Sequence, residues 1–255
     1  MSTYPILEYD GAPRAVLEAD HENLGIVLPP RVAFPFVGDC VDDYARERGL
    51  PVLAVFETVT KRFPVYKVSD SVCLCQAPMG APIAAALMDW MIAYGARQFV
   101  SSGSCGALID LPENALILPR RALRDEGVSY HYMPPSRWSY LDSSMQQRIA
   151  DTFQEKGIAY TECDTWTTDA IFRETVDKVR RCRAEGCGVV DMECASLSAV
   201  AEFRGVQFGQ FLYVADTLAD ADAYDARNWG ADSLKPALML CLEIAGREGD
   251  DSPMY

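Results

Sequence analysis

The chain has 255 residues, of which 49% are apolar, a composition that suits one globular domain with a sizeable core. Its 23 basic and 37 acidic residues give a net charge of −14, which would repel the phosphate backbone of DNA or RNA. No apolar run is long enough to span a membrane, and the acidic N-terminal segment lacks the basic and apolar stretches of a signal peptide. These features count against a nucleic-acid or membrane partner and predict a cytoplasmic protein.

Short apolar, β-branched runs alternate with helical patterns along the chain. This order predicts an α/β domain with layers around a central sheet, spanning residues 1–255 without an internal boundary. The polar segment 247–255 is expected to fray. The predicted strands are 23–28, 31–37, 51–59, 63–68, 71–77, 97–102, 115–119, 187–192 and 206–215. The predicted helices are 41–48, 82–94, 143–156, 173–183, 193–204 and 233–245.

The cysteine and histidine pattern offers no metal or disulfide framework. The nine cysteines include no CxxC pair, and the two histidines, His21 and His131, are far apart in the sequence. Nine is also an odd number, which does not suit a set of paired disulfides. We therefore expect reduced, mostly buried thiols, no metal site and no organic cofactor.

Ligands of open α/β sheets bind beyond the C-terminal ends of the strands. Three of the predicted strands end in residues that could bind a ligand or take part in a reaction. The first contains Gly103 and Ser104, small residues that let a ligand approach backbone amides. The second contains Asp191 and Glu193, and the third ends at Asp216. Each also has a purely structural interpretation: the first as a turn, the second as a helix cap with an acid in its first turn, the third as a capped turn.

Five short segments, in order along the chain, resemble those of the nucleoside phosphorylase superfamily, which includes purine nucleoside phosphorylases, uridine phosphorylases and methylthioadenosine-type nucleosidases. Weaker similarity at VGDCVDDYA (37–45), which contains Gly38, extends the resemblance over most of the chain. It implies a three-layer α/β/α domain with a mixed central sheet and cleavage of a ribose-to-base N-glycosidic bond. The five segments are CQAPMGAPIAAAL (75–87), SSGSCGAL (101–108), TTDAIF (167–172), VVDMECASL (189–197) and VADT (214–217).

The resemblance also implies roles for individual residues. Glu193 would bind the ribose hydroxyls while Met192 packs on the sugar, and a carboxylate suits this because it accepts two hydrogen bonds at once. Asp216 would bond or protonate N7 of a purine base, which favours a purine-type substrate. Asp191 would lie near the base, since residues two apart in a helix diverge by about 200° and only one acid can face the sugar. Met79, Gly103 and Ser104 would line the sugar and nucleophile side, and Ile171 and Phe172 would pack against the base.

Two positions depart from the phosphorylase pattern. Ser101 and Asp42 stand where phosphorylases place two arginines that bind phosphate. The hydrolytic nucleosidases have a carboxylate near the second position, where it activates water, so Asp42 would be catalytic together with Asp216. This favours water as the nucleophile. The alternative is phosphorolysis, with inorganic phosphate as co-substrate bound by other arginines, such as Arg120, Arg121, Arg124 or Arg173.

The sequence therefore predicts an enzyme that cleaves a small-molecule nucleoside, without a metal or other cofactor. A different class of function stays open, a non-catalytic protein that binds or stores nucleosides, because a fold does not guarantee its chemistry. The resemblance also implies a homo-oligomer, a dimer or a hexamer.

Overall fold

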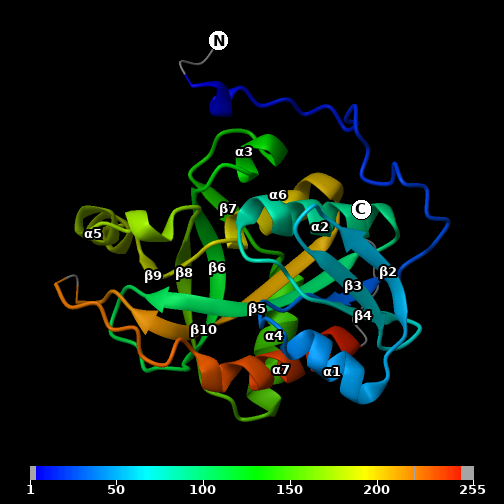
Figure 1. The fold of residues 1–255 in the computed structure, drawn as a ribbon. Helices are drawn as coiled ribbons and strands as arrows, with labels where there is room; N and C mark the ends of the chain where they lie inside the picture. Colours follow the sequence, from blue (N-terminus) through cyan, green and yellow to red (C-terminus); the bar gives the residue numbers. More distant parts are fainter. Residues whose placement is uncertain (1–3, 221, 248–255) are drawn as a thin grey trace.

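The protein is seen in a computed structural model that describes residues 4–220 and 222–247 (Figure 1). Most of the tail that was expected to fray lies outside the described residues. The strands are β1 (Arg31–Ala33), β2 (Val52–Glu57), β3 (Arg62–Lys67), β4 (Val72–Cys75), β5 (Gln98–Ala107), β6 (Leu116–Asp125), β7 (Trp138–Tyr140), β8 (Tyr160–Thr168), β9 (Cys187–Asp191) and β10 (Gln207–Thr217). The α-helices are α1 (Cys40–Arg48), α2 (Ala81–Ala93), α3 (Ser129–Tyr132), α4 (Ser143–Glu155), α5 (Val176–Ala184), α6 (Cys194–Arg204) and α7 (Leu234–Gly246).

One mixed sheet of ten strands runs through the molecule, in the order β10-β6-β8-β9-β5-β1-β4-β3-β2, with β7 paired to β6. β10 pairs with β5 as well as with β6, so β5, β10, β6, β8 and β9 close into a ring. The remaining strands, β1, β4, β3 and β2, extend from β5 as a wing. This closure brings the ends of β5, β9 and β10 together although they lie far apart in the sequence.

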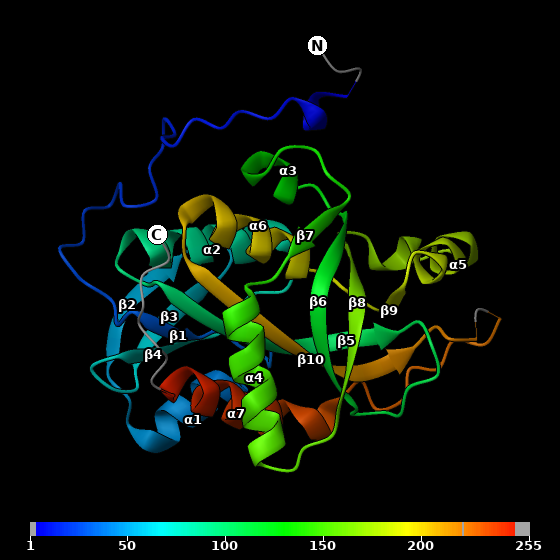
Figure 2. The ribbon, with the colours of Figure 1, turned by 180° about the vertical axis from the view of Figure 1, so that it is seen from behind.

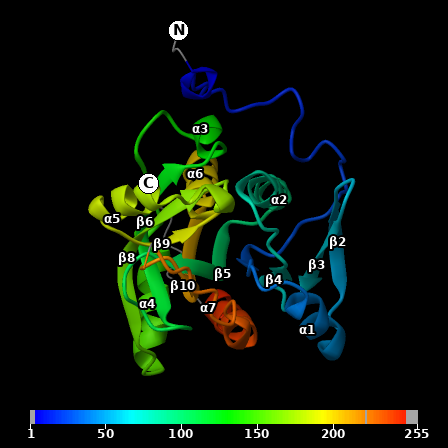
Figure 3. The same ribbon diagram turned by 60° about the vertical axis from the view of Figure 1, so that its left-hand side comes forward.

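Helices cover both faces of the sheet. In Figure 3, α2 and α6 lie on one side of β5, whereas α7 lies on the other. Seen from behind, α4 crosses β10 on the same side as α7 (Figure 2). Each layer has its own apolar cluster, one built around α2 and α6 and one around α4 and α7. The expected three-layer α/β/α architecture with a mixed central sheet is confirmed.

Some predicted elements differ from the structure. The segment 23–28 is not a strand: it runs extended beside the fold, and Leu28 donates its backbone N–H to Tyr94 rather than to a strand. Gly25, at φ 66°, and the two prolines that follow Leu28 interrupt strand geometry there. In the other direction, β8 was not predicted because its sequence, YTECDTWTT, is polar, although its last six residues are buried.

Eight of the nine cysteines are buried, as expected, and all nine are free thiols in the structure. Burial raises the pKa of the Cys194 and Cys105 thiols, which keeps them protonated and unreactive. In the described part of the chain, no helix is long and apolar enough to cross a membrane.

Candidate active site

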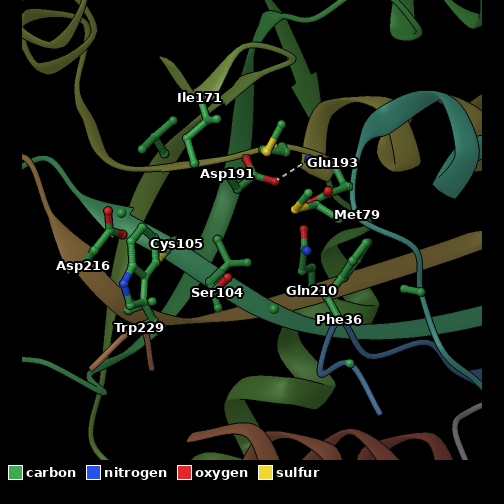
Figure 4. Close-up of a pocket in the computed structure, with 18 of the residues that line it drawn as sticks. Phe36, Met79, Ser104, Cys105, Ile171, Asp191, Glu193, Gln210, Asp216 and Trp229 are labelled. Carbon is green, nitrogen blue, oxygen red and sulfur yellow. Dashed lines mark hydrogen bonds between the residues drawn. The ribbon is translucent and has the colours of Figure 1, made fainter. Parts of the chain in front are cut away.

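A cavity of about 330 Å³ lies where the ends of β5, β9 and β10 meet. Its volume falls within the range of small-molecule sites. Asp216 and Trp229 lie at one end, and Glu193, Met79, Gln210 and Phe36 lie at the other (Figure 4). Nine of the residues predicted from the sequence line it: Gly38, Met79, Gly103, Ser104, Ile171, Asp191, Met192, Glu193 and Asp216.

Asp216 reaches the pocket because β10 is irregular near its end. A register shift between Val214 and Asp216 in the pairing with β5 marks a bulge, a feature that re-aims side chains next to active sites. The partner strand has glycine opposite: a Cβ on Gly106 would lie 3.1 Å from Asp216 Oδ1 and 2.8 Å from Leu218. Burial raises the pKa of Asp216, while the hydrogen bond from the Tyr224 hydroxyl, 2.9 Å from Oδ2, lowers it.

A second carboxyl, Glu174, lines the same end of the pocket. It follows the 3₁₀ turn Ile171–Arg173, which sets both Ile171 and Glu174 on the pocket wall. Burial and the charge of Asp216 raise the pKa of Glu174 to about 7. Two neighbouring carboxyls whose pKa values are raised can hold a proton near neutral pH, as a general acid must.

Aromatic side chains from the loop after β10 form the rim of this end. The rings of Tyr224 and Trp229 lie 6.2 Å apart, and both residues are more than half exposed. They also line an adjoining cavity of about 420 Å³, which shares Ile171, Glu174 and Asp216 with the first. The Asp216 end of the pocket is therefore open and largely apolar beyond its two carboxyls.

Glu193 lies at the opposite end, just before the first residue of α6. Its Oε1 accepts the backbone N–H of Gly80 at 2.6 Å, and Gly80 has a φ of 99° that favours glycine. Glu193 is 7% exposed, and burial together with the charge of Asp191 raises its pKa to about 8. A carboxyl held at this point by the turn before α2 is positioned to bind a hydroxylic ligand.

The carboxylate of Asp191 is bound differently from that of Glu193. Its Oδ1 accepts the hydroxyls of Thr165 and Thr167 at 3.0 and 2.7 Å, and its Oδ2 accepts the N–H groups of Glu193 and Cys194 at 2.9 and 2.6 Å. Burial raises its pKa, and these four hydrogen bonds lower it. Asp191 thus fixes the turn between β9 and α6. It lines the pocket wall, but both of its oxygens already accept hydrogen bonds from protein donors, so the structure gives it a structural role; a role near the base stays a prediction.

The two acids do not lie on one helix, contrary to the expectation that they diverge around it. α6 begins at Cys194, so Asp191 ends a strand and Glu193 lies in a turn. Both carboxyls therefore line one pocket, and their partners rather than a helical angle separate their functions.

The glycines of the first predicted exit lie inside a strand rather than in a loop. β5 continues to Ala107, paired with β10 and β9, because both neighbours extend beside it. Gly103 faces Phe36, where a Cβ would lie 3.3 Å from the phenylalanine Cβ. These small residues line the pocket from within the sheet, and the approach of a ligand to their backbone amides stays a prediction.

Three predicted residues do not line this pocket. Ser101 is fully buried and donates its hydroxyl to Phe34 O at 2.9 Å. Asp42 lies on α1, accepts the Tyr66 hydroxyl at 2.9 Å and faces a separate shallow cavity near β2 and β3. Phe172 is 96% exposed and lines only the adjoining cavity. Asp42 is therefore not among the lining residues of this pocket, and its carboxylate is bound by Tyr66; its activation of water stays a prediction.

No lysine, arginine or histidine lines the pocket in the part of the chain that the structure describes, whereas four carboxylic acids do. Arg120 and Arg121 pair with Asp164, and Arg124 bonds Ser129 and Ser136. Residues 4–220 and 222–247 also contain no group of three or more side chains that could hold a metal ion.

Sequence reasoning missed Gln210, Glu174 and Trp229, all of which line the pocket. Gln210 had a usable signal, since it is an amide within a long apolar strand. Trp229 had none, because no periodicity places a loop residue over a distant strand end.

The chain matches the family profile described as the phosphorylase superfamily over residues 37–238. Among curated proteins, the DeoD-type purine nucleoside phosphorylase of Bacillus cytotoxicus is 25% identical over 146 residues, 54% of this chain and 60% of that protein. A DeoD-type purine nucleoside phosphorylase of Bacillus cereus matches with the same identity and coverage. The match therefore spans about 60% of the length of these curated relatives.

Solved structures with the same fold are found as well. An AMP nucleosidase from Bacteroides thetaiotaomicron has a TM-score of 0.70 at 23% identity, with 86% of this chain and 88% of that chain covered. A purine nucleoside phosphorylase from Toxoplasma gondii has a TM-score of 0.69 at 19% identity, covering 86% and 90%. A uridine phosphorylase from Vibrio fischeri has a TM-score of 0.67 at 22% identity, covering 87% and 94%. At these identities the similarity establishes the fold.

Proposed function

The chain belongs to the phosphorylase superfamily, and on that premise we propose that it cleaves the N-glycosidic bond of a purine-type nucleoside with water as the attacking group. The observation that carries the proposal is that Asp216 and Glu193 lie at opposite ends of one 330 Å³ pocket. One carboxyl can then serve the leaving base while the other binds the sugar. The relatives with known names, purine nucleoside phosphorylases, an AMP nucleosidase and a uridine phosphorylase, support a nucleoside as the substrate.

At the base end, Asp216 is the proposed proton donor. When the bond from C1′ to the base breaks, its electron pair goes to the base, and a proton from Asp216 neutralises the charge that develops there. Burial holds the pKa of Asp216 above its usual range, which favours the protonated form that donation requires. Glu174, with a pKa of about 7, can take up the proton that the attacking water loses and pass it back to Asp216.

At the sugar end, Glu193 is proposed to bind ribose hydroxyls, with Met79 and Met192 packed against the ring. Hydroxyl donors stabilise the ionised carboxylate and would lower its pKa from about 8 as substrate binds. The resulting negative charge then stabilises the cationic character of the sugar in the transition state. Gly80 keeps Oε1 in place by donating its backbone N–H.

Water is favoured over phosphate because of the charge of the pocket. Four carboxylic acids line it, and among the described lining residues none is a cation that could bind a doubly charged anion. Water is neutral, so it enters without this repulsion; its oxygen bonds C1′, and the proton that it loses restores the donor carboxyl. Phosphorolysis is the second candidate, and the observation in its favour is Lys61, whose Nζ contacts Gln76 on the pocket wall at 3.3 Å.

The test is a panel of adenosine, inosine and uridine, each incubated with and without inorganic phosphate, with the products identified. The expected result is release of adenine or hypoxanthine with free ribose, at a rate that phosphate does not increase. Base release that requires phosphate and yields ribose 1-phosphate would establish phosphorolysis instead.

Calorimetric binding of these nucleosides without any base release would favour the non-catalytic binding or storage protein. Assembly into a dimer or hexamer stays a prediction, which light scattering during size-exclusion chromatography can check.

A further inference from the structure

Gln210 lies in the middle of β10 with its side chain in the pocket. The residue is 1% exposed, and neither Nε2 nor Oε1 of its amide has a hydrogen-bond partner among the described residues. Its backbone, by contrast, is fully engaged, since Gln146 accepts its N–H at 2.9 Å and donates to its carbonyl at 3.1 Å. The side-chain amide is therefore the part of Gln210 that the described protein leaves without a partner.

An unpartnered amide at such a buried position lowers the stability of the fold. Burying a polar group without a hydrogen bond destabilises a protein, and buried polar groups in native structures are rarely left in that state. Phe208 and Leu212, two residues before and after on the same strand, are apolar and buried. An apolar residue would suit the strand better at Gln210, so the amide is explained by binding rather than by folding.

The surroundings define the chemistry that the amide can recognise. In Figure 4 the Gln210 side chain points toward Glu193 and Met79 and lies beside Phe36, away from Asp216 and Trp229. It thus belongs to the sugar end of the pocket. A neutral amide donates from Nε2 and accepts at Oε1, which matches a hydroxyl group, itself both a donor and an acceptor.

We propose that Gln210 is a specificity-determining residue whose side-chain amide binds a hydroxyl group at the sugar end of the pocket, either a ribose hydroxyl or the attacking water. The inference deepens the proposed function and rests on it. The Gln210 amide would be a neutral hydrogen-bonding group next to the Glu193 carboxyl, so the hydroxyl would not depend on an ionic contact alone.

The test compares Gln210→Met with the wild-type protein on adenosine and inosine. Methionine has a similar length but no amide, so kcat/KM is expected to fall about tenfold, the usual size of one lost hydrogen bond. Thermal stability should stay level or rise, by about 2 to 4 °C in Tm, because the unpartnered amide is gone. A residue with a merely structural role would show the opposite pattern, a lower Tm and unchanged kinetics of the folded protein.

Gln207→Met is the matched control. Gln207 lies on the same strand three residues earlier, outside the pocket, and its side chain is satisfied by Ser144 and Gln98. The change there should leave kcat/KM within twofold and lower Tm. If Gln210→Met also leaves kcat/KM within twofold on every nucleoside that the wild type cleaves, the inference is overturned.

Deoxynucleosides separate the two sources of the hydroxyl. If the amide binds a ribose hydroxyl, the tenfold difference between wild type and Gln210→Met should vanish with one of 2′-, 3′- or 5′-deoxyadenosine. If it binds the attacking water, the difference should persist with all three and lie in kcat rather than KM. Either result supports the inference.

Failure of the proposed function has a distinct signature, wild-type protein that cleaves no nucleoside of the panel. In that case calorimetry with adenosine decides: weaker binding by Gln210→Met supports a hydroxyl-binding amide, and equal binding, or none by either protein, overturns it.

Discussion

The two ends of the pocket are built by different means. At the proposed sugar end, Asp191 and Glu193 are 5% and 7% exposed. Asp191 is the last residue of β9 and Glu193 lies in the turn before α6, and Asp191 accepts four hydrogen bonds from backbone and threonine donors. At the base end, Asp216 leaves β10 beside a loop whose Tyr224 and Trp229 are 55% and 58% exposed. The first end is buried and closely hydrogen-bonded, whereas the second is open to solvent.

This difference matches what each end would have to recognise. A ribose is the same in every ribonucleoside, so a fixed carboxyl can bind it with little loss of freedom. Bases vary in size and edge, and exposed aromatic rings next to a second cavity can accommodate that variation. The acids also differ in role: Asp191 stabilises the fold, whereas Glu193 and Asp216 remain available for chemistry.

Asp216→Asn should give the largest effect. The amide cannot donate a proton as an acid does, so kcat is expected to fall by roughly 10²- to 10⁴-fold. Stability should be unchanged or slightly higher, because an amide needs no desolvation of a charge. Rates of base release and urea unfolding curves measure the two quantities, and a loss below about fivefold would remove Asp216 from the chemistry.

Asp191→Ala should instead act on the fold. Four donors, from Thr165, Thr167, Glu193 and Cys194, lose their acceptor inside the protein, which is expected to destabilise it by roughly 2 to 4 kcal/mol. Urea unfolding followed by fluorescence measures this loss. A stable Asp191→Ala protein with abolished activity would contradict the structural role and blur the contrast between the two ends.

Glu193→Gln should change how stability depends on pH. The pKa of Glu193 is raised to about 8 in the folded protein, so between its unfolded value and about pH 8 the folded state binds more protons than the unfolded state. Stability from this group is therefore full at low pH and is lost as pH rises through about 8. Glutamine cannot ionise, so the variant should gain, relative to wild type, on the order of a few kcal/mol at high pH. Equal pH profiles of Tm would show that Glu193 is not buried as a carboxyl.

Tyr224→Phe should have a smaller effect at the open end. The Tyr224 hydroxyl lowers the pKa of Asp216, so its removal should raise that pKa further. The acid form then persists to higher pH, and the alkaline limb of the kcat profile should move upward, with only a few-fold change in rate at the optimum. A profile that does not move, or moves toward lower pH, would argue against this contact.

Asp42→Asn should have the smallest effect. Asp42 lies outside the pocket and bonds Tyr66, so kcat/KM is expected to stay within about twofold of wild type. Tyr66→Phe is the companion change, since it removes the same hydrogen bond from the other side. A loss of activity as large as that of Asp216→Asn would show that Asp42 takes part in catalysis, as the sequence predicts.

Much of the site was predictable because its residues follow local patterns. Gly103, Glu193 and Asp216 each stand at or near the end of an apolar run, and the sheet brings such ends together. β8 was not predictable in this way because its sequence is polar, and only the structure shows that two of its buried threonines donate hydrogen bonds to Asp191. The segment 23–28 had the composition of a strand but no neighbouring strand to pair with.

By itself, the sequence determined the fold class, the acidic character of the protein and nine of the residues that line the pocket, because each of these follows from composition, from short patterns along the chain or from the family resemblance that those patterns carry. Only the tertiary structure decided what each polar group does. Asp191 is bound by donors from β8, Asp42 is held by Tyr66 of β3, and Gln210 faces the pocket without a partner in the described protein. The physical reason is that the reactivity of a side chain depends on its burial and on its hydrogen-bond partners, which come from segments far away in the sequence.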